Sequence, residues 1–135
     1  MMMIRADEVN ADEPVMHRNG ILTEGASSNV FILRDGRLLT PALDAPRPIL
    51  AGVTRQLVIE AAESLGHPVG VEDIPVEAFR TAEEAFVSSS RRLVAAITSI
   101  DGIPVHDGEP GAVTMALLRE LHRRIGADTG TLQGR

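Results

Sequence analysis

The stretch 23–41, TEGASSNVFILRDGRLLTP, decides the fold of this chain. Its centre, Asn29–Leu33, is an apolar run of strand length, and the residues that follow, Arg34–Arg37, contain an Asp-Gly pair that favours a hairpin turn. Leu38–Pro41 then predicts the returning strand. The stretch therefore predicts two antiparallel strands, preceded by a loop of small residues at 25–28.

The residues upstream repeat the same pattern. Val15–His17 and Ile21–Glu24 have strand length and flank Arg18–Asn19–Gly20, in which Asn-Gly is the strongest short signal for a hairpin. Two consecutive hairpins predict an antiparallel meander. Residues 1–13 are acidic and polar and show no usable periodicity, so we expect a flexible lead-in there.

The residues downstream predict two principal helices and three further strands. Apolar residues repeat at helical spacing from about Val53 to Leu65 and from about Pro110 to Ile125. Strands are expected at Val69–Ile74, Glu84–Ser88 and Leu93–Ile100. Together with the meander, these elements predict an α/β (α+β) fold with a mainly antiparallel sheet.

The composition indicates one soluble domain and excludes several functions. The chain has 135 residues, of which 44% are hydrophobic, and we expect one domain at 14–126 and a flexible tail at 127–135. The net charge is −6, so nucleic acid is not an expected partner. No apolar run is long enough to span a bilayer and no signal peptide is recognisable, so we expect a cytoplasmic protein with no membrane partner.

Three polar segments are candidates for binding chemistry: 23–29 around Glu24, 50–55 around Gly52–Val53–Thr54, and the serine loop 88–92. A helix that begins near Gly52 would present free N–H groups and the positive end of its dipole to an anion. The plainer alternative is an ordinary capped helix start, because most helix starts bind no ligand.

The other two segments also have plain alternatives. Three serine hydroxyls, helped by Arg91 or Arg92, can clasp a phosphate, or they can form an ordinary polar turn. Glu24 can accept a hydrogen bond from a protonated ring nitrogen, or it can be a surface acid. The four histidines, at positions 17, 67, 106 and 122, are not spaced as metal ligands, so no metal site is expected.

In this order and spacing, the three segments together resemble the class IV aminotransferases, which use pyridoxal 5'-phosphate (PLP). The resemblance is carried by TEGASSNVFILRDGRLLTP, ILAGVTR, FVSSSRR, IDG and DGEPG, and it is strongest toward the D-amino-acid aminotransferase branch. It implies a barrel-like C-terminal domain with two principal helices and PLP as cofactor. The activity implied for the parent enzyme is amino transfer between a D-amino acid and a 2-oxo acid.

The resemblance also implies roles for single residues. Glu24 matches the acid that keeps the pyridine nitrogen protonated, which makes the ring an electron sink. Leu50 matches the apolar residue packed on one face of the ring. Arg91 stands where the family has a small or hydroxyl residue near the substrate. Its side chain therefore either clashes with the substrate, turns away from it, or binds a carboxylate. The remaining implied cofactor contacts are Ser27 and Ser28 near the ring, and Gly52, Val53, Thr54, Ser89 and Ser90 around the phosphate.

The chain contains no lysine, whereas the family forms its Schiff base through one. We therefore assign no catalytic residue and expect PLP to bind non-covalently at best. The expected function is a fragment of a class IV aminotransferase that is inactive by itself. The alternatives are half of a split enzyme of the branched-chain-aminotransferase or aminodeoxychorismate-lyase type, completed by a separate N-terminal half, and a non-catalytic domain that binds PLP or another phosphate. Apolar surface left by a missing partner domain also predicts a homo-oligomer.

Overall fold

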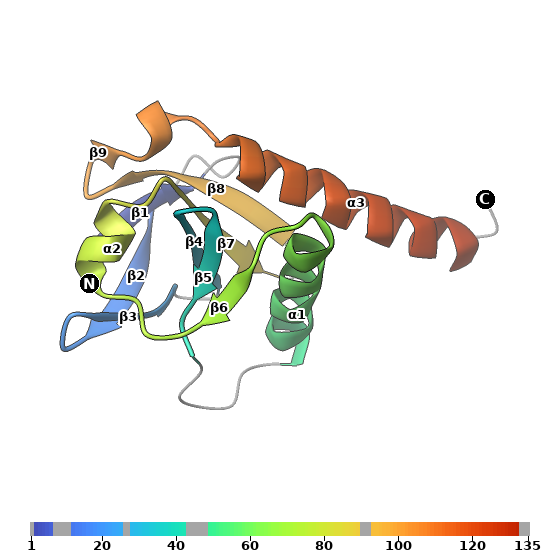
Figure 1. Cartoon of the computed structure of the whole chain (residues 1–135), viewed down its shortest axis with the longest axis horizontal. Helices are drawn as coiled ribbons and strands as arrows, with labels where there is room; N and C mark the ends of the chain where they lie inside the picture. The colour runs from blue at the N-terminus through green and yellow to red at the C-terminus, as the bar shows by residue number, and fades with distance from the viewer. Residues whose placement is uncertain (1, 7–11, 26–27, 43–48, 90–92, 133–135) are drawn as a thin grey trace.

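The computed structural model describes residues 2–6, 12–25, 28–42, 49–89 and 93–132. Figure 1 shows strands curled around a core, with α1 and α3 on one side of the sheet and α2 on the other. The elements, in chain order, are β1 (Met2–Ala6), β2 (Asp12–Arg18), β3 (Ile21–Gly25), β4 (Asn29–Arg34), β5 (Arg37–Thr40), α1 (Ile49–Ser64), β6 (Val69–Val71), α2 (Val76–Arg80), β7 (Glu84–Ser89), β8 (Leu93–Ile100), β9 (Ile103–Pro104), the short 3-10 helix η1 (His106–Gly108) and α3 (Ala112–Leu132).

One curled sheet contains all the described strands. Its neighbours follow the order β3-β2-β1-β8-β7-β4-β5-β6, with β9 paired to β8. The pair β5–β6 is parallel, and the other described pairs are antiparallel. The two ends of the sheet meet where Leu22 N donates to Ile74 O at 2.8 Å and Val76 N donates to Gly20 O at 2.9 Å. The predicted barrel-like, mainly antiparallel fold is therefore confirmed.

Both predicted hairpins are present. Asn19 and Gly20 join β2 to β3 with φ values of 54° and 76°, and Asp35 and Gly36 join β4 to β5 with φ values of 52° and 78°. Positive φ at both central residues matches the right-handed twist of the flanking strands. Asn-Gly and Asp-Gly tolerate this geometry, which explains why these pairs located the turns correctly.

The segment 1–13, for which a flexible lead-in without periodicity is expected, begins with regular structure. Met2–Ala6 form β1, which lies between β2 and β8, and its alternate residues Met2, Ile4 and Ala6 are at most 1% exposed. β2 also begins earlier than expected, at Asp12. The period-two apolar pattern of β1 is only five residues long and is followed by acids, so local periodicity did not reveal it.

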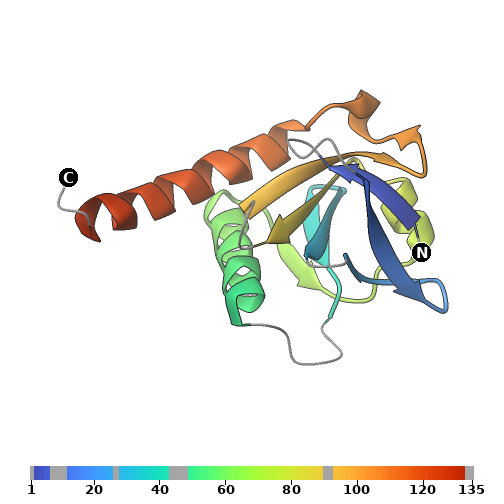
Figure 2. The same cartoon turned by 180° about the vertical axis from the view of Figure 1, so that it is seen from behind.

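Both principal helices are longer than expected. α1 begins at Ile49 rather than near Val53, and the backbone of α3 remains helical to Leu132, through much of the expected tail. A glycine inside a helix costs only about 1 kcal/mol relative to alanine, so Gly52 and Gly126 do not end these helices. Figures 1 and 2 show that the C-terminal part of α3 extends beyond the sheet.

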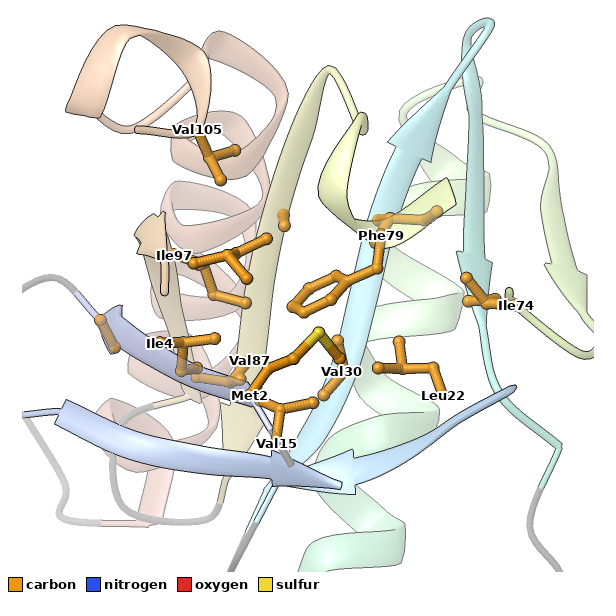
Figure 3. Packing of buried hydrophobic residues seen from close by; sticks show 14 of the residues in the cluster. Met2, Ile4, Val15, Leu22, Val30, Ile74, Phe79, Val87, Ile97 and Val105 are labelled. Atoms are coloured by element: carbon orange, nitrogen blue, oxygen red, sulfur yellow. The ribbon is translucent and has the colours of Figure 1, made fainter. Parts of the chain in front are cut away.

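The sheet separates two hydrophobic cores. The first fills the barrel, and Figure 3 shows Phe79 of α2 pointing into its centre, toward Met2, Val30 and Val87. The second lies between the outer face of the sheet and helices α1 and α3. There the rings of Phe31 and Phe86 stack with centroids 4.9 Å apart.

Asp101 ties β1 to the turn between β8 and β9. Met3 N donates to Asp101 Oδ1 at 2.8 Å, and Arg80 Nη2 donates to Asp101 Oδ2, also at 2.8 Å. The amide of Asp101 returns a hydrogen bond to Met3 O at 2.7 Å. The Met3 amide, followed by the Arg80 guanidinium, holds the pKa of Asp101 below its ordinary value of 3.8.

We expect acid to weaken the fold in part through Asp101. Because the folded-state pKa is depressed, its stabilisation is complete above the unfolded pKa and is lost as the pH falls through the folded value. The free energy of unfolding of Asp101→Asn should therefore fall less steeply than that of the parent chain from about pH 4 to pH 2, measured by denaturant titration. Glu109→Gln, an exposed control, should follow the parent, and equal slopes for Asp101→Asn and the parent would contradict the prediction.

Candidate functional site

The serine loop and the start of β4 meet at one end of the sheet. Asn29 at the start of β4 lies opposite Ser88 near the end of β7. Ser88 and Ser89 in turn lie opposite Val94 and Leu93 of β8. Antiparallel pairing therefore brings together two of the three candidate segments, as the resemblance implies.

The two described serines of β7 face opposite sides of the sheet, because side chains alternate along a strand. Ser88 shares its face with Phe86, which belongs to the core beneath α1 and α3. Ser89 shares its face with Val87, which lies inside the barrel. Both serines are buried, with exposed fractions of 0% and 7%.

Two serine hydroxyls at this end of the sheet are buried without a hydrogen-bond partner among the described residues. They belong to Ser28, which immediately precedes β4, and to Ser88, and the two residues are 1% and 0% exposed. Leaving a hydroxyl unsatisfied in a protein interior costs about 1–3 kcal/mol, so such groups are rare in folded proteins. The hydroxyls of Ser28 and Ser88 therefore keep an unused hydrogen-bonding capacity in the interior of this end of the sheet.

Helix α1 approaches the same end of the sheet. Arg55 Nη2 donates to the carbonyl of Pro41, which directly follows β5, at 3.2 Å. Thr54 is 5% exposed, whereas Val53 is 51% exposed. A Cβ built on Gly52 would have no atom within 4 Å, so there is open space beside the beginning of α1.

The interpretation of residues 52–54 as a helix start needs correction. A helix leaves only its first four N–H groups without intrahelical acceptors, and α1 begins at Ile49. The amides of Val53 and Thr54 therefore belong to the hydrogen-bond ladder of the helix. The polar side chain that this segment brings to the site is that of Thr54. The glycine at position 52 suggested a boundary that the helix does not have.

Several predicted site residues fall outside what the structure describes. Ser27, Ser90 and Arg91 lie in undescribed segments. Glu24 lies on β3, as predicted, and Leu50 lies in the first turn of α1, but the structure describes only the backbone at these two positions. The roles of these five residues remain predictions.

One buried carboxylate, that of Glu84, has no signal in the local sequence pattern. Its Oε1 accepts hydrogen bonds from Thr114 N at 2.8 Å and from Thr114 Oγ1 at 2.7 Å, and its Oε2 accepts one from Val113 N at 3.2 Å. Glu84 therefore caps the N-terminus of α3 from strand β7. Gly111 permits this approach, because a Cβ there would overlap the Glu84 carboxyl group.

Two other kinds of site are absent from the described residues. No helix there is long and apolar enough to cross a bilayer. In the same part of the chain, no group of three or more His, Asp or Glu side chains could hold a metal ion.

Comparison with known proteins identifies the family. The model of the family "Amino-transferase class IV" matches residues 1–100. A D-alanine aminotransferase of Listeria monocytogenes serotype 1/2a (strain 10403S) is 39% identical over 129 residues, which cover 96% of this chain and 44% of the relative. A D-alanine aminotransferase of Listeria innocua is 42% identical over 129 residues, with the same coverage. The chain thus spans less than half the length of these relatives.

Solved structures show the same relationship. A putative branched-chain amino acid aminotransferase from Thermotoga maritima matches with a TM-score of 0.72 and 32% identity, covering 84% of this chain and 41% of that one. The branched-chain amino acid aminotransferase from Escherichia coli matches with a TM-score of 0.68 and 31% identity, covering 84% and 37%. Sequence, fold and family model agree, and the chain belongs to the class IV aminotransferase family.

Proposed function

We propose that this chain forms the cofactor-binding part of a PLP-dependent aminotransferase whose parent enzyme transfers amino groups between D-amino acids and 2-oxo acids. The observation that carries the proposal is the pair of buried, unpaired hydroxyls of Ser28 and Ser88, where β4, β7 and α1 meet. The D-alanine aminotransferases among its relatives favour a D-amino acid as the substrate.

The described residues fit a phosphorylated pyridine at this end of the sheet. Hydroxyl groups come from the residue before β4, from β7 and from α1, and open space adjoins Gly52. When bound, PLP would supply the electron sink that stabilises a substrate carbanion. We propose that Glu24 keeps the ring nitrogen protonated and that Leu50 packs on the ring. The other proposed cofactor contacts are Ser27, Ser28, Ser89, Ser90 and the Thr54 side chain, with Gly52 and Val53 beside the open space at α1 and Arg91 near the substrate.

The cofactor would be held here without a covalent bond, because the sequence has no lysine. Transamination in this family needs a lysine that forms the Schiff base and moves the proton, so we propose that this chain alone is inactive. A separate N-terminal half, or further residues of a longer chain, would supply that lysine. We also propose a cytoplasmic location, and self-association through apolar surface that such a partner would cover.

A branched-chain aminotransferase is the second candidate. It is favoured by the structural match to branched-chain amino acid aminotransferases. An aminodeoxychorismate lyase and a non-catalytic PLP-binding domain are further alternatives. The D-amino-acid enzyme and these three alternatives would share the cofactor site. They would differ in their substrate contacts or in the partner half.

Titration of the purified chain with PLP tests the shared part of the proposal. We expect a saturable change in the absorbance of PLP and, after borohydride reduction, no covalent adduct by mass spectrometry, apart from one at the α-amino group. Light scattering of the same samples reports self-association. Absence of saturation at millimolar PLP would reject a preformed cofactor site, and an adduct on any side chain would reject non-covalent binding.

Ser88→Ala separates a ligand-binding role from a structural one. Removing an unpaired buried hydroxyl should leave the free energy of unfolding of the free chain unchanged or raise it. The same change should weaken PLP binding about tenfold, because one hydrogen bond of about 1.4 kcal/mol is lost. Ser99→Ala, elsewhere on the sheet, is the matched control and should change neither quantity. A destabilised Ser88→Ala chain with unchanged PLP affinity would assign Ser88 to the fold instead.

A further inference from the structure

A cavity lies at the opposite end of β4 from Ser28. Its volume is about 410 Å³, and it is formed by the β4–β5 turn, the end of β6 and the segment that leads into α2. This volume falls in the range of small-molecule sites, roughly 300–1,000 Å³. Asn29 and Arg34, at the two ends of β4, are separated by about 17 Å of extended strand. The cavity is therefore distinct from the proposed cofactor site.

The cavity combines an apolar floor with a charged rim. Leu39 and Ile74, which are 7% and 1% exposed, belong to the barrel core and contribute to the floor together with Pro75 and Ala78. The charged lining residues are Arg34, Asp35, Arg37, Glu72 and Asp73.

One wall of the cavity depends on Gly70. Arg37 Nη2 pairs with Glu72 Oε2 at 3.3 Å, and this pair lies against the backbone of β6. A Cβ on Gly70 would stand 2.7 Å from Arg37 Nη2 and 2.9 Å from Glu72 Oε2, closer than real side chains allow. The bare glycine therefore lets this ion pair occupy its position, and Arg37 and Glu72 largely neutralise each other.

The remaining charges of the rim have opposite signs. Within the described part of the chain, the carboxylates of Asp35 and Asp73 form no hydrogen bond or ion pair. Arg34 Nη1 donates to Thr81 Oγ1 at 3.2 Å, which uses one of the five N–H donors of its guanidinium group. The rim thus offers two acceptors for a cation and one guanidinium for a carboxylate.

We propose that this cavity binds a small zwitterion, namely an α-amino acid with a compact aliphatic side chain. Its ammonium group would face Asp35 and Asp73, and its carboxylate would face Arg34. Its aliphatic group would rest against Leu39, Pro75 and Ala78. A ligand with only one of the two charges would leave part of the rim unmatched. The proposal does not depend on PLP binding at the serine end of the sheet.

Calorimetric titration with L-valine, 3-methylbutanoate and 2-methylpropylamine tests this proposal. The second compound is valine without its amino group, and the third is valine without its carboxylate. We expect saturable binding of L-valine and at least tenfold weaker binding of the two analogues. In a ¹⁵N-resolved spectrum, L-valine should shift the amide signals of Asp35 and Asp73. No saturation by L-valine at millimolar concentration, or equal affinity for either analogue, would overturn the proposal.

Variants locate the binding. Asp73→Asn and Arg34→Gln, both at exposed positions, should each weaken L-valine binding about tenfold, and Gly70→Ala should weaken it by displacing the Arg37–Glu72 pair. Ser28→Ala, at the other end of β4, should leave the affinity unchanged, and this also distinguishes the cavity from the proposed PLP site. Unchanged affinity in Asp73→Asn and Arg34→Gln would place the bound valine elsewhere and refute the assignment.

Discussion

Replacement of Glu84 by alanine should lower the free energy of unfolding by about 3 kcal/mol, because charge-assisted hydrogen bonds to helix-capping groups are lost. The Glu84 carboxylate is 6% exposed and accepts three hydrogen bonds from Val113 and Thr114. Thr114 is itself buried, so its amide and hydroxyl would have no water to replace the carboxylate. The first turn of α3 would lose its attachment to β7.

Thermal unfolding followed by circular dichroism measures this effect. A loss of about 3 kcal/mol in a domain of this size lowers Tm by roughly 10 °C. Glu84→Gln keeps one acceptor oxygen for Thr114 and should lose about half as much. Glu63→Ala is the matched control, since Glu63 is an exposed glutamate of α1 whose side chain forms no hydrogen bond or ion pair with the described residues. If Glu84→Ala and Glu63→Ala unfold at the same temperature, the capping role is refuted.

Replacement of Phe79 by alanine should have an effect of similar or larger size, about 4 kcal/mol, since it removes a buried aromatic ring from a packed core. Phe79 is fully buried, and its ring lies in the middle of the barrel core (Figure 3). It also anchors α2, which has five residues and cannot persist alone. The segment before α2 carries the hydrogen bonds to Gly20 and Leu22 that close the sheet.

Two measurements distinguish a local loss of barrel closure from a uniform destabilisation of the fold. Denaturant titration should give the loss in unfolding free energy, and amide hydrogen exchange should show the largest loss of protection at Leu22 and Val76, where the barrel closes. Phe79→Leu retains most of the buried volume and should cost less than half as much. Val71→Ala, at a 51% exposed position, is the control and should be close to neutral. Equal protection of Val76 in the parent and in Phe79→Ala would show that Phe79 does not hold the closure.

The elements that were predicted correctly are those whose signal is local. Asn19–Gly20 and Asp35–Gly36 located two turns because the positive φ that they adopt is a property of the residues themselves. β1 was missed because its burial depends on β8, whose residues come more than ninety positions later. Gly52 suggests a helix boundary that the structure does not have, because a local rule cannot distinguish a glycine inside a helix from one at its end.

The candidate site also combines features with a local sequence signal and features that depend on distant parts of the chain. The segments 23–29 and 88–92 could be identified from their residue types and their resemblance to a family, and β4 and β7 bring them together. The burial of Ser88 could not be predicted, because it depends on which face of β7 lies beneath α1. Glu84 and Thr114 are thirty residues apart and belong to different elements, so no local pattern connects them.

The position of β1 in the middle of the sheet affects how the chain emerges from the ribosome. β2 follows β1 within a few residues and can pair with it at once, whereas β8 is completed only at Ile100. At synthesis rates of about 5–20 residues per second, the other edge of β1 waits roughly 5–20 s for its partner. During that time an apolar strand, with Met2 and Ile4 unburied, presents open backbone groups to any neighbouring nascent chain. The interval before β8 emerges is therefore the period in which this protein is most exposed to misassembly.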